Sequence, residues 1–293
     1  MKTAESGGDP APLLTVRDLR IGFGPTEAVK GISFELRRGE TVALVGESGS
    51  GKSVTSLALM GLLGGAPRLS GTATFQSAQF GDLDVLTAPE PHRRRLRGRE
   101  LAMIFQEPMT SLNPVHQCGD QIDEVLRHHL RLPAAEARAR TLELLTEAGL
   151  PDPTRAARAY PHELSGGQKQ RVMIAMALAC NPALLIADEP TTALDVTVQA
   201  RILRLLAELR ARHNAALLFI THDLGVVAEI ADRVLVLYRG ELVESGPVRE
   251  IFRNPQHPYT RGLLACRPQR TAQRLAVLPT VADFLAVETP TGV

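Results

Sequence analysis

The stretch that decides the fold is Gly46-Glu47-Ser48-Gly49-Ser50-Gly51-Lys52-Ser53, which fits the pattern G-x-x-x-x-G-K-[ST] at every fixed position. A short apolar run, Thr41–Val45, precedes it, and a helical pattern follows it over residues 52–63. In a strand–loop–helix unit of this kind, backbone N–H groups converge on phosphate oxygens at the positive end of the helix. Lys52 can reach the β- and γ-phosphates of ATP, and the Ser53 hydroxyl can ligate Mg²⁺. A flexible Ser/Gly turn that matches by chance would lack these flanking elements.

A second apolar strand, expected over residues 183–187, ends in the two acids Asp188 and Glu189. A strand that delivers Asp188 beside the phosphate loop lets its carboxylate hold Mg²⁺ through water. Glu189 would then be placed to polarise the attacking water. Taken alone, two acids after a strand are usually a helix N-cap and a surface charge, so this interpretation depends on the phosphate loop.

The rest of the chain alternates strand-like and helix-like patterns. Two segments with alternating apolar and polar positions, 13–23 and 28–36, predict an antiparallel sheet with one wet face. An Ala-, Leu-, Glu- and Arg-rich block predicts an inserted helical subdomain from residue 118 to about 149. A second glycine loop, at residues 165–167, is predicted to open a helix that runs through residue 179. The remaining predicted elements are a strand at 101–105, a helix at Val196–His213, a strand at 215–221 and a hairpin of 233–238 with 241–244. The alternation predicts an α/β fold with a mostly parallel core sheet.

The composition narrows the classes of partner. The chain has 293 residues, a net charge of +1, 4% aromatic residues and no Trp, which disfavours nucleic acid as a partner. No apolar run approaches the roughly 18 to 20 residues that a membrane-spanning helix needs, and the first ten residues are typical of a frayed tail. The three cysteines, Cys118, Cys180 and Cys266, are far apart, which predicts free thiols in a reducing compartment rather than a disulfide framework or a zinc site.

The stretch Leu164-Ser165-Gly166-Gly167-Gln168 resembles the signature loop of the ATP-binding-cassette (ABC) ATPases. The resemblance implies a P-loop NTPase of the ABC type, with an antiparallel β-subdomain and a helical subdomain added to the core. In that family the signature loop presses against the γ-phosphate bound by the opposite subunit, which repeats in trans the anion-binding end of a helix. The resemblance extends from about residue 13 to residue 266.

Other positions match the family's motifs in order. Gln106 resembles the Q-loop glutamine that senses Mg²⁺ and couples to the membrane partner, and Ala193-Leu194-Asp195 resembles the D-loop. His222 resembles the switch histidine, and Phe23 stands where the family places an aromatic ring against adenine, although a plain core Phe is the alternative. The expected catalytic residues are Lys52, Gln106, Glu189 and His222, and the expected Mg²⁺ ligands are Ser53, Gln106 and Asp188. The expected ATP-binding residues are Phe23, Gly46, Glu47, Ser48, Gly49, Ser50, Gly51, Lys52, Ser53, Gln106, Ser165, Gly166, Gly167, Gln168, Asp188 and Asp195.

Two further stretches resemble a narrower group, the oligopeptide/dipeptide importer ATPases. They are Gln106-Glu107-Pro108-Met109-Thr110-Ser111-Leu112-Asn113-Pro114 and Asn254-Pro255-Gln256-His257-Pro258-Tyr259-Thr260. The expected division is a disordered tail at 1–12, an ATPase domain at 13–252 with a helical subdomain at about 107–180, and a C-terminal extension at 253–293. Many relatives end in a cysteine-rich motif that binds an iron–sulfur cluster in some, but Cys266 is the single cysteine of this tail, so no cluster is expected.

The resemblance implies the ATP-hydrolysing subunit of an importer of peptides or a similar small solute, with nickel and glutathione as alternatives. The implied partners are a second ATPase subunit, identical or paralogous, in a head-to-tail dimer, two membrane permeases and, indirectly, an extracytoplasmic solute-binding protein. The implied location is the cytoplasmic face of the bacterial inner membrane. A soluble ABC protein that acts on nucleic acid or ribosomes is one alternative, and a purely regulatory nucleotide-binding module is another. One cassette and a near-neutral charge disfavour the first, while intact Lys52 and Glu189 disfavour the second.

A basic run at residues 92–99 carries five arginines. A solvated basic face is the favoured interpretation, because no amphipathic helical pattern is evident there. Attraction to anionic lipid headgroups is the alternative, since each basic residue near such a surface contributes about 1 kcal/mol.

Overall fold

A computed structural model of the chain describes residues 11–106, 111–191 and 195–266. Its centre is a six-stranded sheet with the order β10-β9-β3-β8-β7-β6. Every neighbouring pair is parallel except β9 and the edge strand β10. The strands are β3 (Thr41–Val45), β6 (Leu101–Ile104), β7 (Leu184–Asp188), β8 (Ala216–Thr221), β9 (Arg233–Tyr238) and β10 (Glu241–Pro247). The expected α/β fold with a mostly parallel core is confirmed.

Both faces of this sheet are covered, as the continuous apolar strands require. Along β3, Val42 and Leu44 point to one cluster of buried residues, while Ala43 and Val45 point to another. The first cluster also contains the inner face of α1 (Lys52–Met60) and of the second sheet. That sheet is antiparallel with the order β2-β1-β4-β5. Its strands are β1 (Leu14–Phe23), β2 (Thr26–Leu36), β4 (Arg68–Ser77) and β5 (Gly81–Asp84).

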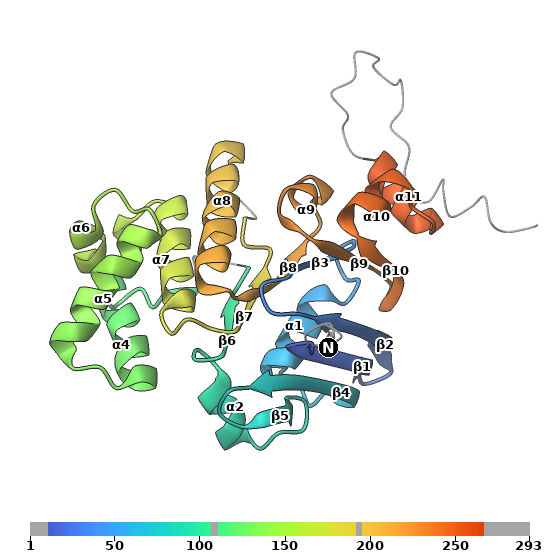
Figure 1. The fold of residues 1–293 in the computed structure, drawn as a ribbon, viewed down its shortest axis with the longest axis horizontal. Helices are drawn as coiled ribbons and strands as arrows, with labels where there is room; N and C mark the ends of the chain where they lie inside the picture. The colour runs from blue at the N-terminus through green and yellow to red at the C-terminus, as the bar shows by residue number, and fades with distance from the viewer. Residues whose placement is uncertain (1–10, 107–110, 192–194, 267–293) are drawn as a thin grey trace, which may run out of the picture.

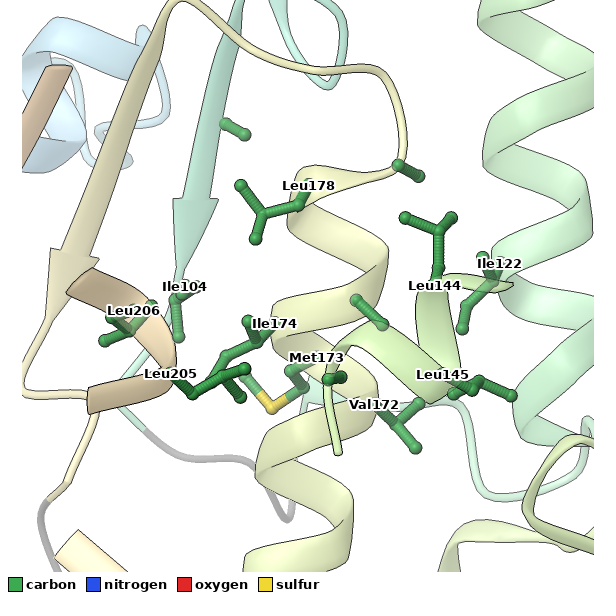
Figure 2. Packing of buried hydrophobic residues seen from close by; sticks show 14 of the residues in the cluster. Ile104, Ile122, Leu144, Leu145, Val172, Met173, Ile174, Leu178, Leu205 and Leu206 are labelled. Atoms are coloured by element: carbon green, nitrogen blue, oxygen red, sulfur yellow. The ribbon is translucent and has the colours of Figure 1, made fainter. Parts of the chain in front are cut away.

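A layer of helices stands beside the β6 and β7 edge of the core sheet (Figure 1). It consists of α4 (Cys118–Leu130), α5 (Ala134–Glu147), α6 (Pro153–Arg158), a 3-10 turn (Pro161–Glu163) and α7 (Gly166–Leu178). Leu144 and Leu145 of α5 meet Val172 and Met173 of α7, and this cluster continues to Ile104 of β6 (Figure 2). One hydrophobic cluster therefore joins the helical layer to the core sheet.

One long helix and several short ones cover other parts of the core sheet. The long helix α8 (Val196–His213) packs on the same cluster as α7 through Leu205 and Leu206. The helices α9 (Leu224–Ile230), α10 (Val248–Arg253) and α11 (Pro258–Ala265) lie over the opposite end of the sheet, near β9 and β10 (Figure 1). Among the described residues, no helix is long and apolar enough to cross a membrane.

Several elements differ from the sequence-based expectation. The strands β4 and β5 and the helices α6, α9, α10 and α11 were not predicted, and the first predicted helix ends at Met60 rather than at residue 63. The short helix α2 (Glu90–Leu96) was not predicted either, and it carries part of the basic run at residues 92–99. The tail at 1–10, the Q-loop segment 107–110, the D-loop positions 193 and 194, and the C-terminal stretch 267–293 lie outside the described residues.

Candidate functional site

The phosphate loop has a backbone that only glycine can adopt at two of its positions. Gly46 has φ +155°, and a Cβ there would lie 2.1 Å from the carbonyl oxygen of Leu237. Gly51 has φ +104°, and a Cβ there would lie 2.7 Å from the carbonyl oxygen of Ala28. The loop is therefore pressed against the end of β9 and against β2, and its curl is set by these contacts.

Lys52 lies over this curl. Its ammonium donates to the carbonyl oxygens of Gly46 and Glu47, both at 2.8 Å, and the side chain is buried. Burial lowers the pKa of Lys52, while Glu189, Asp188 and Glu47 act to raise it. A cation that is confined among carbonyl groups and acids is well placed to exchange these partners for phosphate oxygens.

Asp188 and Ser53 form the pair expected to hold Mg²⁺. The Ser53 hydroxyl donates to Oδ1 of Asp188 at 3.1 Å, and Ser56 donates to Oδ2 at 3.4 Å. Burial raises the pKa of Asp188, and the hydrogen bond from Ser53 opposes that shift. A buried carboxylate beside a hydroxyl at the foot of the phosphate loop is the oxygen donor set that Mg²⁺ prefers, so these residues fit the metal.

We expect the substitution Asp188→Asn to raise the thermal stability of the nucleotide-free chain at neutral pH. The pKa of Asp188 in the folded chain is raised above its ordinary value of 3.8. Stability therefore falls as the pH rises through the window from 3.8 to the folded-state pKa, and the full penalty is present above it. The amide removes this penalty and can still hydrogen-bond to Ser53 and Ser56. Differential scanning fluorimetry should show a higher Tm, by roughly 2–4 °C per kcal/mol gained, and a smaller gain as the pH approaches 3.8.

Asp152→Asn is the matched control for this stability measurement. Asp152 is exposed and caps α6, where its Oδ1 accepts from the backbone N–H of Arg155 at 2.9 Å. Asn caps a helix about as well as Asp, so Tm should not change. Equal shifts in the two variants, or a lower Tm in Asp188→Asn, would contradict a burial penalty at Asp188.

Glu189 follows β7 in a backbone conformation that is unusual for a residue with a side chain. Its φ is +45°, in the left-handed region, although its N–H still donates to the carbonyl oxygen of Ile220 at 2.9 Å. Left-handed backbone at a non-glycine residue costs about 1–3 kcal/mol and persists only where its surroundings impose it. Oε2 of Glu189 accepts from Nε2 of Gln106 at 3.2 Å, and Oε1 lies 3.2 Å from Nδ1 of His222. The three residues, predicted from separate parts of the sequence, thus meet at one carboxylate.

Gln106 and Glu189 share a small hollow with the phosphate loop. Its lining includes Ala28, Ser48, Gly49, Lys52, Ser53, Gln106 and Glu189. The carboxyl ends of β3, β6, β7 and β8 deliver the loop, Gln106, Asp188 and His222 to the same edge of the sheet. In open α/β sheets, ligands bind at this edge.

The structure leaves the other expected site residues away from this hollow. The signature residues begin α7, where the Ser165 hydroxyl accepts from the Gln168 N–H at 3.4 Å and the Gln168 side chain accepts from the Ser165 N–H at 3.0 Å. Asp195 caps α8 by accepting from the Val198 N–H at 2.9 Å. Phe23, at the end of β1, is partly buried and packs against the core. Within the described residues, no hydrogen bond joins these groups to the phosphate loop of the same chain.

Tyr259 touches the phosphate loop and was not predicted as a site residue. It belongs to α11, is fully buried, and its hydroxyl accepts a hydrogen bond from the backbone N–H of Glu47 at 2.9 Å. Its ring packs against that of Tyr238 at a tilt of 31°, with 4.2 Å between the centroids. Burial raises the pKa of Tyr259 to about 12, so its hydroxyl stays neutral. The signal in the sequence was the segment around Asn254–Thr260, which resembled a subfamily feature but gave no indication of what it contacts.

Comparison with known proteins agrees with this geometry. The sequence model of the family described as "ABC transporter" matches residues 29–192. The model described as "Oligopeptide/dipeptide transporter, C-terminal region" matches residues 243–285, which include Tyr259. The dimeric post-hydrolysis structure of an ATP-binding cassette bound to ADP and Pi has a TM-score of 0.70 and 28% identity, and the match covers 80% of this chain and 99% of that one.

Several curated relatives are more similar to this chain in sequence than that solved structure is. A putative peptide import ATP-binding protein of Brucella ovis is 50% identical over 94% of this chain and 86% of its own length. The oligopeptide transport ATP-binding protein OppD of Bacillus subtilis is 52% identical over 87% of this chain and 72% of its own length. A peptidoglycan transport ATP-binding protein, YejF of Agrobacterium fabrum, is 56% identical over 88% of this chain, which spans 47% of that relative. The chain therefore belongs to the ABC transporter family of ATP-binding proteins, in the group that carries the oligopeptide/dipeptide transporter C-terminal region.

Proposed function

We propose that this ABC ATPase hydrolyses Mg-ATP through Glu189 and couples the reaction to the uptake of peptides through a separate membrane permease. The observation that supports this most directly is the placement of Glu189, whose carboxylate lies between Gln106 and His222 at the edge of the phosphate loop. Peptides are proposed as the solute because several relatives are named for peptide, oligopeptide or dipeptide transport. Another relative is named for glutathione import, and glutathione is itself a small peptide.

Each residue at the hollow has a proposed role. The loop N–H groups and Lys52 bind the phosphates, and Ser53 and Asp188 hold Mg²⁺ with help from Gln106. The metal would neutralise charge on the transferred phosphoryl group. Glu189 accepts a proton from the attacking water, and His222 orients that carboxylate and contacts the γ-phosphate. Phe23 is proposed to stack on the adenine ring.

The signature residues are proposed to complete a second chain's site. Ser165–Gln168 lies at the N-terminus of α7, where free N–H groups and the positive helix end favour an anion. Because these residues make no hydrogen bond to the phosphate loop within the described part of one chain, we propose a head-to-tail pair that encloses two ATP molecules. The proposed assembly also contains two permease subunits and, indirectly, an extracytoplasmic solute-binding protein. Its proposed location is the inner face of a bacterial membrane.

The proposed division of the chain is an ATPase unit over 13–252, with its helical part within about 107–180, and an extension over 253–293. The helices α4 to α7 occupy the helical part, α10 ends at the boundary of the extension, and α11 lies within the extension. Because Tyr259 bonds to the phosphate loop, the extension is proposed to act within the ATPase unit rather than as an independent module.

Co-expression with the permeases encoded by neighbouring genes tests the proposed function. The chain should sediment with membranes when the permeases are present, and vesicles that contain the complex should take up radiolabelled peptide only with ATP inside the compartment that holds the ATPase. A chain that stays in the supernatant with its permeases present would overturn the importer proposal.

Tyr259→Phe should weaken ATP binding. The substitution leaves the N–H of Glu47 without its acceptor in a partly buried place, which typically costs about 1–3 kcal/mol. If the conformation of the loop that binds ATP is destabilised by about 1–2 kcal/mol, the KM for ATP rises by roughly 5- to 30-fold. Steady-state kinetics should show this rise in KM with a smaller change in kcat.

Tyr238→Phe is the matched control, because the ring of Tyr238 packs against that of Tyr259 and has no hydrogen bond to the phosphate loop among the described residues. Its KM for ATP should stay close to that of the wild type. If the two variants have the same KM, the hydroxyl of Tyr259 does not position the loop.

A further inference from the structure

The arginines of α2 and of the turn that follows it divide between two faces. Arg93 and Arg97 both pair with Glu90, at 3.1 and 2.8 Å. Arg97 also donates to the carbonyl oxygens of Met60 and Gly61, at 2.7 and 2.9 Å, and so binds the C-terminal end of α1. These two arginines therefore have a structural role.

The other three arginines, Arg94, Arg95 and Arg99, are exposed and make no ion pair among the described residues. They line a hollow of about 530 Å³. The opposite wall comes from the end of α4, which contributes His128 and His129 and is followed by Arg131. The hollow thus collects four arginines from two parts of the chain that are about 30 residues apart in sequence.

Charge in the hollow is strongly one-sided. No carboxylate belongs to its lining in the described part of the chain. The carbonyl ends of α2 and α4 each offset roughly half an elementary charge, which leaves about three of the four guanidinium charges uncompensated. A second hollow, beside α10, has a balanced charge by contrast. Its lining contains the arginines Arg249 and Arg253 together with the carboxylates of Glu244 and Glu250.

The two walls are held in place by contact. Gly98 has φ +76°, and a Cβ there would lie 2.7 Å from Nε2 of His129, so the imidazole is seated directly on the turn between α2 and β6. The pKa of His129 is lowered by burial, by His128 and by Arg99. This contact holds the two walls of the hollow against each other before any ligand binds, which reduces the ordering that binding requires.

We propose that this hollow is a second anion site, distinct from the nucleotide site, that binds a ligand carrying two or more phosphate groups. Guanidinium groups match phosphate oxygens in bidentate pairs, and several converging arginines favour an extended or doubly charged phosphate over a single carboxylate. The hollow lies in the volume range of small-molecule sites. It shares no lining residue with the phosphate-loop hollow, and the inference does not depend on the proposed transport function.

Inorganic pyrophosphate is the probe for this site. Titration calorimetry on the full chain, with its nucleotide site saturated by a non-hydrolysable ATP analogue and Mg²⁺, should show one pyrophosphate bound per chain. The variant Arg94→Gln/Arg99→Gln should bind it at least about tenfold more weakly, because two of the four cations are lost. The control Arg249→Gln/Arg253→Gln causes the same change in net charge, from +1 to −1, and should bind like the wild type.

Vesicles distinguish the natural source of the phosphate groups. If the source is a lipid headgroup, the wild-type chain sediments with vesicles of phosphatidylcholine that contain cardiolipin, pyrophosphate displaces it, and the double variant stays in solution. If the source is a soluble phosphate compound, pyrophosphate binds and the vesicles do not. No pyrophosphate binding by the wild type, or equal binding by the double variant and the wild type, would overturn the proposal.

Discussion

Glu189→Gln is expected to reduce ATP turnover by at least about 100-fold, since a positioned general base contributes roughly 10²–10⁴ to the rate. The amide has the shape of the carboxylate but cannot accept the proton of the attacking water. Nucleotide binding should survive, because Lys52, Ser53 and the loop backbone keep their partners. We therefore expect the variant to accumulate as an ATP-bound dimer, measurable as a shift in size-exclusion chromatography alongside a phosphate-release assay.

Glu229→Gln provides the matched change at an exposed position of α9. Its turnover should equal that of the wild type. Wild-type turnover in Glu189→Gln would remove Glu189 from the reaction, whereas loss of nucleotide binding in that variant would show that the carboxylate serves the loop's structure.

The second large effect is expected at the signature loop, where Ser165→Arg should abolish turnover while the chain still binds ATP. The hydroxyl of Ser165 caps α7, and losing a cap costs about 1 kcal/mol. A long cation at the helix end also fills the space in which a partner's γ-phosphate would lie and removes a donor group from it. ATPase activity of the assembled complex should fall by at least about 100-fold, with nucleotide affinity of the isolated chain unchanged.

Two comparisons separate the causes of that loss. Ser165→Ala removes the cap without adding bulk, so it should lose less activity than Ser165→Arg. In a self-paired preparation, mixing Lys52→Ala with Ser165→Arg places both defects in one composite site and leaves the other site intact, so activity should return. If mixed self-paired dimers stay inactive, the two motifs do not meet across subunits.

The sequence was most informative where function requires a local pattern. The phosphate loop, the acids Asp188 and Glu189 at the end of β7 and the signature residues at the start of α7 are each set by a few adjacent residues, and the structure has each of them in the expected element. The left-handed backbone of Glu189 could not be predicted from the sequence, because it is imposed by neighbouring strands rather than by the residue's own preference.

The elements that were missed have weak local patterns. The first half of β4 is exposed and rich in Ser, Gly and Thr, so it resembles a loop, and its pairing with β1 is a long-range contact. The helix α9 has the sequence LGVVAEI, whose Val residues and Gly disfavour a helix. Its N-cap is Asp223, which accepts from the Gly225 N–H at 2.7 Å and was the available signal. The sequence also did not predict which arginines near α2 are bound within the chain and which are exposed. That division depends on Glu90 and on the end of α1, neither of which lies within the basic run itself.

The hydrogen bond from Glu47 to Tyr259 has a consequence for the order of biosynthesis. The two residues are 212 positions apart in the chain, and the neighbours of β3 in the sheet, β8 and β9, also come late in the sequence. At about 5–20 residues per second, a ribosome needs about 10–40 seconds to travel from one residue to the other. A nascent chain therefore has a phosphate loop that lacks these contacts until β8, β9 and Tyr259 have been synthesised, and its capacity to bind ATP should appear only after that point.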